Sequence, residues 1–327
     1  MLIVEKKRYL VAQVQKNSLV IYKMLTVSNY HYIRESYTSN YPSIFGVTPP
    51  QFENQLKLLK KIGDFITSNE LITNLDSVLS SNDNYLFVTF DDGLKEQFDH
   101  ALPILEELDI PAIFFANSRN FEEKKVSTVH KIHLLRSILA PNVFLEQLAC
   151  FKMDVLNDVD AIRAKEIYRY DDDKSATLKY LLNFKLDFRT QEAIIKSIFD
   201  LHFDENTVLD ELYMNEENII DLAKRGYLGS HTHSHFPVGL LDAQEIRFEL
   251  SNSKLYFEKL TDSIINMTAY PYGTDEACTD EVASIAKTIG YQAGFTTKRG
   301  TNTKGINRLL MNRFDCNDLP GGKNYIK

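Results

Sequence analysis

The chain has 327 residues, of which 44% are hydrophobic and 25% are charged, as in an ordinary globular protein. This length predicts one large domain or two ordinary ones, with a sizeable core. The formal net charge of −8 argues against a nucleic-acid partner, because binding phosphate groups requires a basic surface.

The cysteines and the N-terminal segment indicate an intracellular protein. The three cysteines are odd in number and form no C-x-x-C pair, which argues against a disulfide framework. Residues 1–8 carry charges where a signal peptide would need an apolar core. The sequence contains no run of about 18 apolar residues, so it predicts no membrane span. We therefore expect a cytoplasmic protein without a transmembrane segment.

The first third of the chain alternates strands and helices. Residues 1–23 indicate a strand or hairpin extension outside the main domain. Pro49 and Pro50 are typical of a helix start, and the apolar residues that follow have helical spacing. The expected elements are strands at 24–30, 85–90 and 112–116 and helices at 51–62 and 97–108. A strand, a helix and a strand at this spacing form a βαβ unit.

The alternation stops at residue 121 and resumes at residue 212. The intervening stretch is charged and poor in proline and glycine, with expected helices at 130–139, 143–150, 161–168, 175–182 and 190–203. We interpret residues 121–211 as a helical insertion, either a lid or wall that selects substrate, or a scaffold and dimer contact. Later helices are expected at 219–224, 243–260 and 276–289, and strands at 227–230, 265–270, 293–296 and 308–313. Residues 24–120 and 212–327 thus form a parallel sheet or an α/β barrel, which the pattern alone does not separate.

Residues able to hold a metal follow two of the expected strands. Asp91 and Asp92 end the first run, and His231 and His235 end the second. One aspartate and two neutral imidazoles are a ligand set for a divalent metal with a position left for water, and the second acid is then free to act as a base. Taken alone, the acidic pair is typical of a turn, and histidines four apart share one helical face. Their shared place at the carboxyl ends of strands favours a common site.

At these residues the chain resembles a known family. Thr89-Phe90-Asp91-Asp92-Gly93 and the His231–His235 segment are similar to the first two signature motifs of the polysaccharide deacetylases, the NodB-homology enzymes of carbohydrate esterase family 4. Supporting similarities are the first-strand segment 29–33, the third-motif segment 269–273 in its exopolysaccharide-deacetylase form, and the late-strand segment 295–297. The resemblance implies a distorted (β/α)7 barrel with a helical insertion.

The resemblance also implies a role for each matching residue. Asp92, His231 and His235 would be the metal ligands, and Asp91 the general base that takes a proton from the water that the metal activates. The backbone N–H of Tyr272 would stabilise the developing oxyanion. The expected substrate contacts are Tyr270, Pro271 and Tyr272. For the aromatic side chains, the alternative is ordinary core packing.

Zinc is the expected metal, although Co²⁺, Ni²⁺ and Fe²⁺ also suit one carboxylate and two imidazoles. The same ligand set occurs in non-haem iron oxygenases. The order of the ligands along the chain and the α/β pattern both argue against that class.

The chain departs from the family pattern at two places. Ala269 stands where the family has an arginine that orients the base, and Arg308 or Arg313 is a candidate to replace it. No histidine follows His235, where the family has the proton donor for the leaving amine. His31 comes directly after the first strand, and we consider it either catalytic or a buried structural histidine.

The expected function is removal of an N-acetyl or other small N-acyl group from an amino sugar. An intracellular place favours a nucleotide-linked, lipid-linked or oligosaccharide substrate, in the synthesis of a bacterial surface polysaccharide such as O-antigen or capsule. The alternatives are a carbohydrate O-acetyl esterase and a catalytically impaired carbohydrate-binding protein. The sequence leaves the oligomeric state open, with a homo-oligomer among the alternatives.

Overall fold

The computed structural model describes residues 24–35, 46–151, 156–169 and 171–325. The expected N-terminal extension of residues 1–23 lies outside the described residues. The described residues form two compact units. The first contains residues 24–35, 46–123 and 212–325, and the second contains the described residues of 124–211. The domain division expected from the sequence, with boundaries at 120 and 211, stays a prediction.

A parallel sheet organises the first unit. Its strands are β1 (Met24–Tyr30), β2 (Asp64–Phe65), β3 (Asn84–Phe90), β4 (Ala112–Ala116), β5 (Leu228–Ser230), β6 (Met267–Ala269), β7 (Ala293–Phe295) and β8 (Phe314–Asp315). The spatial order is β7-β6-β5-β4-β3-β1-β8, and β2 pairs with β3 outside this path. A parallel bridge between Phe295 and Met311 brings the segment before β8 against β7, while β8 itself pairs with β1. The expected distorted (β/α)7 barrel is therefore confirmed.

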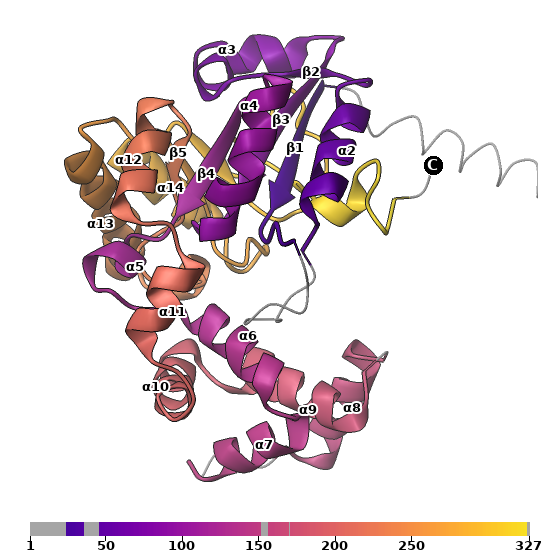
Figure 1. The fold of residues 1–327 in the computed structure, drawn as a ribbon, viewed down its shortest axis with the longest axis vertical. Helices are drawn as coiled ribbons and strands as arrows, with labels where there is room; N and C mark the ends of the chain where they lie inside the picture. The colour runs from indigo at the N-terminus through magenta and orange to yellow at the C-terminus, as the bar shows by residue number, and fades with distance from the viewer. Residues whose placement is uncertain (1–23, 36–45, 152–155, 170, 326–327) are drawn as a thin grey trace, which may run out of the picture. The chain divides into compact units, whose positions relative to one another are not determined.

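Helices surround the barrel and connect its strands. They are α2 (Pro49–Leu59), α3 (Ser68–Ser80), α4 (Leu102–Leu108), α5 (Ser118–Glu122), α12 (Glu216–Lys224), α13 (Ala243–Thr261) and α14 (Asp280–Ile289), with short turns η1 (Gln97–Ala101), η3 (Val238–Leu240) and η4 (Cys316–Asp318). Figure 1 shows α2 and α4 lying over β1, β3 and β4. Capping boxes begin α2 at Thr48 and α3 at Thr67, because each threonine satisfies a backbone N–H of the first turn.

The strands separate two hydrophobic clusters, because successive side chains point to opposite faces. Tyr30, Phe90 and Phe114 pack outward against α2 and α4, and the rings of Phe90 and Phe114 stack 4.5 Å apart. Inside the barrel, Phe87 stacks on Phe295 at 5.8 Å, and the apolar face of α3 packs against the same inner cluster. The aromatic core thus fixes the strands whose carboxyl ends carry the acidic pair.

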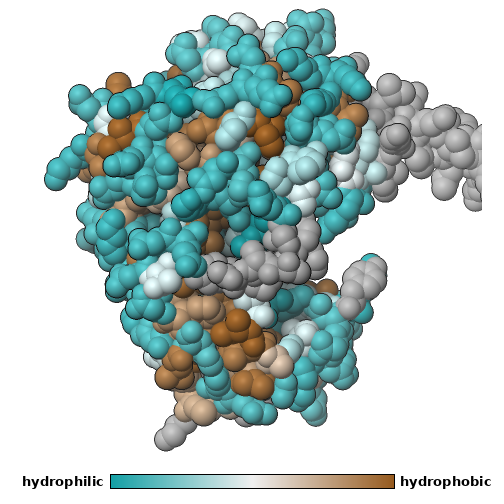
Figure 2. All heavy atoms as spheres, in the orientation of Figure 1, coloured by the Kyte–Doolittle hydropathy of each residue, from teal (hydrophilic) through white to brown (hydrophobic). Residues whose placement is uncertain are grey.

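The second unit is helical. It contains α6 (Thr128–Ile138), α7 (Pro141–Ala149), α8 (Asp158–Ile167), α9 (Asp173–Tyr180), η2 (Leu181–Lys185) and α10 (Phe188–Phe199), and most of α11 (Glu205–Leu212). A buried Lys131 pairs with Glu205 at 2.6 Å and lies over the ring of Phe199. Many apolar side chains of this unit lie at the surface, among them those of Ile138, Val159, Ile162, Ile167 and Phe184 (Figure 2). No helix among the described residues is long and apolar enough to cross a membrane.

Some local expectations were wrong or incomplete. The expected strand at 308–313 is not formed; only Met311 makes a bridge there, and the strand begins at Phe314. The short elements β2 and α5 were missed because two to five residues carry no readable periodicity. Helix α3 was also missed, although Thr67 and Glu70 form a capping box that is visible in the sequence.

Truncation of Phe114 tests the importance of the outer aromatic cluster. We expect Phe114→Ala to lower the free energy of unfolding by about 3–5 kcal/mol, because it leaves a cavity beside Phe90. Leu255→Ala is the control, since Leu255 is 62% exposed and its truncation should change stability by less than about 0.5 kcal/mol. Urea denaturation of both variants measures this, and equal effects would contradict the packing argument.

Candidate metal-binding site

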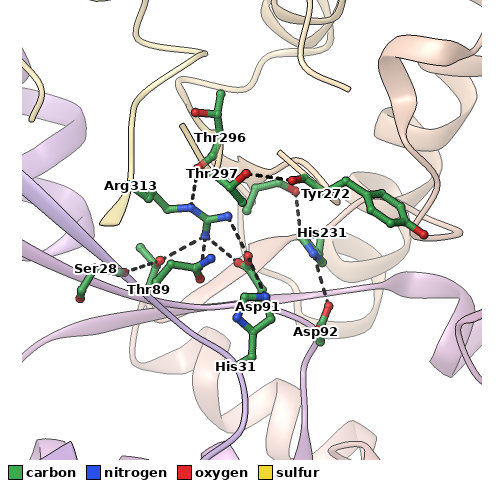
Figure 3. Close-up of polar contacts among 12 residues, drawn as sticks. Ser28, His31, Thr89, Asp91, Asp92, His231, Tyr272, Thr296, Thr297 and Arg313 are labelled. Carbon is green, nitrogen blue, oxygen red and sulfur yellow. Dashed lines mark hydrogen bonds and ion pairs between the residues drawn. The ribbon is translucent and has the colours of Figure 1, made fainter. Parts of the chain in front are cut away.

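The functional candidates gather at the carboxyl ends of the barrel strands. Asp91 and Asp92 follow β3, His231 follows β5, and Tyr272 follows β6. Arg313 comes directly before β8. In barrels of alternating strands and helices, the active site forms at this end, where the connecting loops converge. Figure 3 shows Asp91, Asp92 and His231 close together, with Arg313 turned toward Asp91 and the Tyr272 ring pointing away from Asp91.

Asp92, His231 and His235 present three ligand atoms to one point. The Nε2 atoms of His231 and His235 lie 3.4 Å and 3.1 Å from Oδ1 of Asp92. All three ligand atoms lie within 4.8 Å of one another, and all three residues are buried. Ligand atoms about 2.1 Å from a tetrahedral ion are about 3.4 Å apart. The donors and their spacing therefore fit a single divalent ion such as zinc.

A backbone contact orients the first histidine. Nδ1 of His231 lies 2.7 Å from the carbonyl oxygen of Ala269, so that Nδ1–H donates to it and Nε2 is left to face Asp92. Burial by itself lowers the pKa of His231, but the negative charges of Asp91 and Asp92 raise that pKa above its ordinary value. The electrostatic field at this point thus favours positive charge, as a cation site requires.

The two histidines approach each other through a loop and not through a helix. We had considered a shared helical face, but residues 231–235 have no helical structure. Thr232 and His235 have φ angles of 65° and 60°, and Asp92 and Tyr272 have φ angles of 79° and 63°. Such left-handed conformations in residues other than glycine cost about 1–3 kcal/mol each and are typical of functional sites. The strain collects around the candidate metal ligands.

Arg313 holds the second acid, Asp91, in a bidentate contact. Nη1 and Nη2 of Arg313 each donate to one carboxylate oxygen of Asp91 at 2.7 Å. The arginine is held in turn by three further acceptors, the Thr296 carbonyl oxygen, the Asn29 side chain and the Thr89 hydroxyl. Both charged side chains are buried.

Of the two arginines that the sequence offers as partners for Asp91, Arg313 is therefore the one that contacts it. The other, Arg308, is exposed and lines a surface cavity with Asp76 and Leu79 of α3. Thr89 belongs to the first signature motif, but the sequence analysis assigns it no role; in the structure its hydroxyl accepts from Arg313. Its spacing of two residues from Asp91 places both side chains on one face of the strand end, a signal that the sequence contained.

The Arg313 contact decides the charge of Asp91. Burial by itself raises the pKa of the Asp91 carboxyl, but the Arg313 guanidinium, with smaller effects from His231 and His31, holds that pKa below its ordinary value. Asp91 is therefore ionised at neutral pH, and it can accept a proton.

His31 and Tyr272 form the accessible side of the site. Nε2 of His31 lies 3.8 Å from Oδ2 of Asp91, and the His31 side chain is 39% exposed. The Tyr272 side chain is 45% exposed, and its ring lies 5.4 Å from the ring of His235. Both residues therefore combine contact with the buried groups and access from solvent.

The other two expected substrate contacts are placed differently. Tyr270 is completely buried and belongs to the outer hydrophobic cluster, and Pro271 is also buried. Neither offers a surface on which a sugar ring could stack. The geometry argues for core packing of Tyr270 and Pro271, and it leaves Tyr272 as the aromatic residue of this segment that a ligand can reach.

Comparisons with known proteins point to one family. The sequence profile described as Polysaccharide deacetylase matches residues 79–142 and 201–294. YxkH of Bacillus subtilis (strain 168), which is named as a polysaccharide deacetylase, is 26% identical over 102 residues, which cover 31% of this chain and 36% of that protein. The match thus spans about a third of the length of this curated relative.

Solved structures share the fold. The Streptococcus pyogenes deacetylase PplD, in complex with acetate, has a TM-score of 0.55 at 16% identity and covers 90% of this chain and 92% of that chain. IcaB from Ammonifex degensii has a TM-score of 0.54 at 18% identity and covers 89% and 91%. These structures share the fold of the chain, and the sequence profile and the curated relative confirm its resemblance to the polysaccharide deacetylase family.

Proposed function

We propose that the protein is a metal-dependent hydrolase that removes an acetyl group from the nitrogen of an acetylated amino sugar. The observation that carries this proposal is a buried carboxylate, Asp91, kept ionised by Arg313 beside the three donors Asp92, His231 and His235. A base next to a metal site is the equipment of hydrolysis. Resemblance to this family supports an acetylated carbohydrate as the substrate class.

Each residue has a separate task in this reaction. Asp92, His231 and His235 hold the ion, which we expect to be zinc, with Co²⁺, Ni²⁺ or Fe²⁺ as alternatives. When bound, such an ion polarises the acetyl carbonyl and lowers the pKa of a nearby water. Asp91 accepts the proton of the attacking water while Arg313 keeps the carboxylate oriented.

The leaving nitrogen needs a proton when the carbon–nitrogen bond breaks. His31 is our candidate for the donor, because it lies beside Asp91 and is reachable from solvent. The new carbon–oxygen bond forms with the water, and the products are acetate and a free amine. We assign the backbone N–H of Tyr272 to the oxyanion that develops on the carbonyl oxygen.

Two other functions would use the same residues. A carbohydrate O-acetyl esterase needs the same base and the same ion, so the substrate alone separates it from an N-deacetylase. A catalytically impaired carbohydrate-binding protein was motivated by Ala269 and by the missing late histidine. The contact between Arg313 and Asp91 removes the first of these reasons, since the base has an orienting cation.

The biological setting is a further part of the proposal. We propose a cytoplasmic role in the synthesis of a bacterial surface polysaccharide such as O-antigen or capsule, on a nucleotide-linked, lipid-linked or oligosaccharide substrate. Activity restricted to long exported polymers would count against this setting.

Acetate release tests the reaction itself. We expect the zinc-loaded protein to release acetate from at least one member of a panel of N-acetylated and O-acetylated sugars, nucleotide sugars and oligosaccharides. Asp91→Asn should retain zinc but lose about 10²–10⁴-fold in kcat, because the proton acceptor is gone. His235→Ala should lose zinc and activity together. Full activity of Asp91→Asn would refute the assigned base.

Replacing Arg313 tests the electrostatic role of the buried pair. In Arg313→Met the guanidinium no longer opposes the effect of burial on Asp91, so the pKa of Asp91 should rise. Because the base works only when ionised, the acidic limb of the kcat/KM profile should move to higher pH by the same amount. The exposed Arg308→Met is the matched control and should leave the profile unchanged. An unshifted acidic limb in folded Arg313→Met would contradict this role.

Replacing His31 tests the proton donor. We expect His31→Gln to lower kcat by about 10²-fold or more on an amide substrate, because an amine leaves poorly without a proton. An O-acetyl substrate with an acidic phenol as its leaving group should lose much less, since that group departs without protonation. Equal losses on both substrates would indicate a structural role for His31, and zinc affinity serves as the control for an intact site.

A further inference from the structure

The loop between the two histidine ligands has to be held in an unfavourable conformation. Thr232 and His235 both adopt left-handed backbone angles, which few residues other than glycine populate. Such conformations persist only where the surroundings determine them. The contacts that hold this loop therefore decide where the two imidazoles point.

Backbone N–H groups of helix α5 hold the loop by donating to the carbonyl groups of the loop. The N–H groups of Ser118 and Arg119, in the first turn of α5, donate to the carbonyl oxygens of Thr232 and His233 at 3.3 Å and 3.1 Å. The loop thus satisfies helix N–H groups that would otherwise lack a partner within the helix. These contacts fix one edge of the loop.

Helix α13 holds the opposite edge through Glu249. The Glu249 side chain is buried, with only 4% of the residue exposed, and it projects from the helix toward the loop. One carboxylate oxygen, Oε2, accepts the N–H of His233 at 3.1 Å and the N–H of Ser234 at 2.7 Å. Hydrogen bonds to an ionised acceptor are roughly twice as strong as those between neutral groups.

The side chain of His233 is turned away from the metal ligands. His233 is buried. Its Nδ1 lies 2.8 Å from the Ser118 hydroxyl, and its Nε2 lies 3.1 Å from Glu123. The His233 ring thus ties the middle of the loop to α5, while the His233 backbone is tied to Glu249.

We propose that Glu249 is a positioning residue of the metal site. By accepting both N–H groups in the middle of the His231–His235 loop, it holds the loop in the conformation that directs both imidazoles at Asp92. This inference rests on the proposed metal-dependent function. Glu249 contacts no ligand side chain, so its effect reaches the ion only through the loop backbone.

Loss of the Glu249 carboxylate has a specific consequence. Without it, the Ser234 N–H loses its acceptor, and the His233 N–H keeps only the backbone carbonyl oxygen of Glu249, 3.0 Å away. The loop then relaxes away from its left-handed angles. The two imidazoles then no longer converge in the free protein, and binding the ion must reorder them. Loss of a group that supports a metal ligand from outside the ligand set typically weakens metal affinity by about 10–100-fold.

Zinc affinity of Glu249→Ala, measured by competition with a chelator, tests the proposal. Glu258→Ala is the matched control, because Glu258 lies on the same helix and accepts a backbone N–H at 3.0 Å, but from Ile265, outside the loop. Glu249→Ala should bind zinc about 10–100-fold more weakly than the parent. Glu258→Ala should retain the parent affinity. Circular dichroism and thermal unfolding in chelator establish that each variant folds.

The visible absorption spectrum of the Co²⁺-loaded protein gives a second measurement, because it reports ligand geometry. It should change in Glu249→Ala and stay unchanged in Glu258→Ala. Parent-like zinc affinity in folded Glu249→Ala would overturn the proposal, and so would an equal loss of affinity in both variants.

If Glu249→Ala does not fold, Glu249→Asp decides the question. It keeps the charge but withdraws the carboxylate from the loop, so its zinc affinity should fall, and parent-like affinity would overturn the proposal. If the parent binds neither zinc nor Co²⁺, Ni²⁺ or Fe²⁺, the metal-dependent function and this inference are refuted together. Binding that is equal in parent and variant refutes the inference alone.

Discussion

The buried ion pair between Arg313 and Asp91 is the interaction on which the site depends. Taking both charges out of water is unfavourable unless the geometry is good and the remaining donors are satisfied. Both guanidinium nitrogens that face Asp91 make short contacts, and the other donor directions reach Thr296, Asn29 and Thr89. Asn29 and Thr89 belong to β1 and β3, and Thr296 directly follows β7. The pair therefore links three parts of the barrel and keeps Asp91 ionised.

The backbone strain lies in the site, and the contacts that support the strained residues come from the surrounding helices. The candidate metal ligands Asp92 and His235 have left-handed backbone conformations, which are unfavourable for residues other than glycine. The surrounding helices offset this cost, α5 through its first N–H groups and α13 through Glu249. A rigid aromatic core behind β3 and β4 gives these contacts a fixed frame. The site is thus held by groups that do not themselves touch a ligand atom.

The exchange of one arginine for another illustrates what such a site requires. By resemblance, the family places the orienting arginine at the position of Ala269, at the end of β6. Here the guanidinium comes from residue 313, more than forty residues later in the chain. A carboxylate responds to the place and orientation of the charge and not to the strand that supplies it. The Ala269 carbonyl meanwhile orients His231, so the position keeps a structural part in the site.

The sequence by itself predicted the alternation of strands and helices, the resemblance to the family with its barrel fold, and the candidates Asp91, Asp92, His231 and His235, because strand periodicity and short motifs are local properties. The sequence also limited the candidates for the arginine that orients Asp91 to Arg308 and Arg313. Only the tertiary structure showed that Arg313 is the one that contacts Asp91 and that Tyr270 lies in the core. It also showed the hydrogen bonds from the histidine loop to Glu249. Each of these depends on contacts between residues far apart in the chain, and periodicity carries no information about which distant side chains will meet.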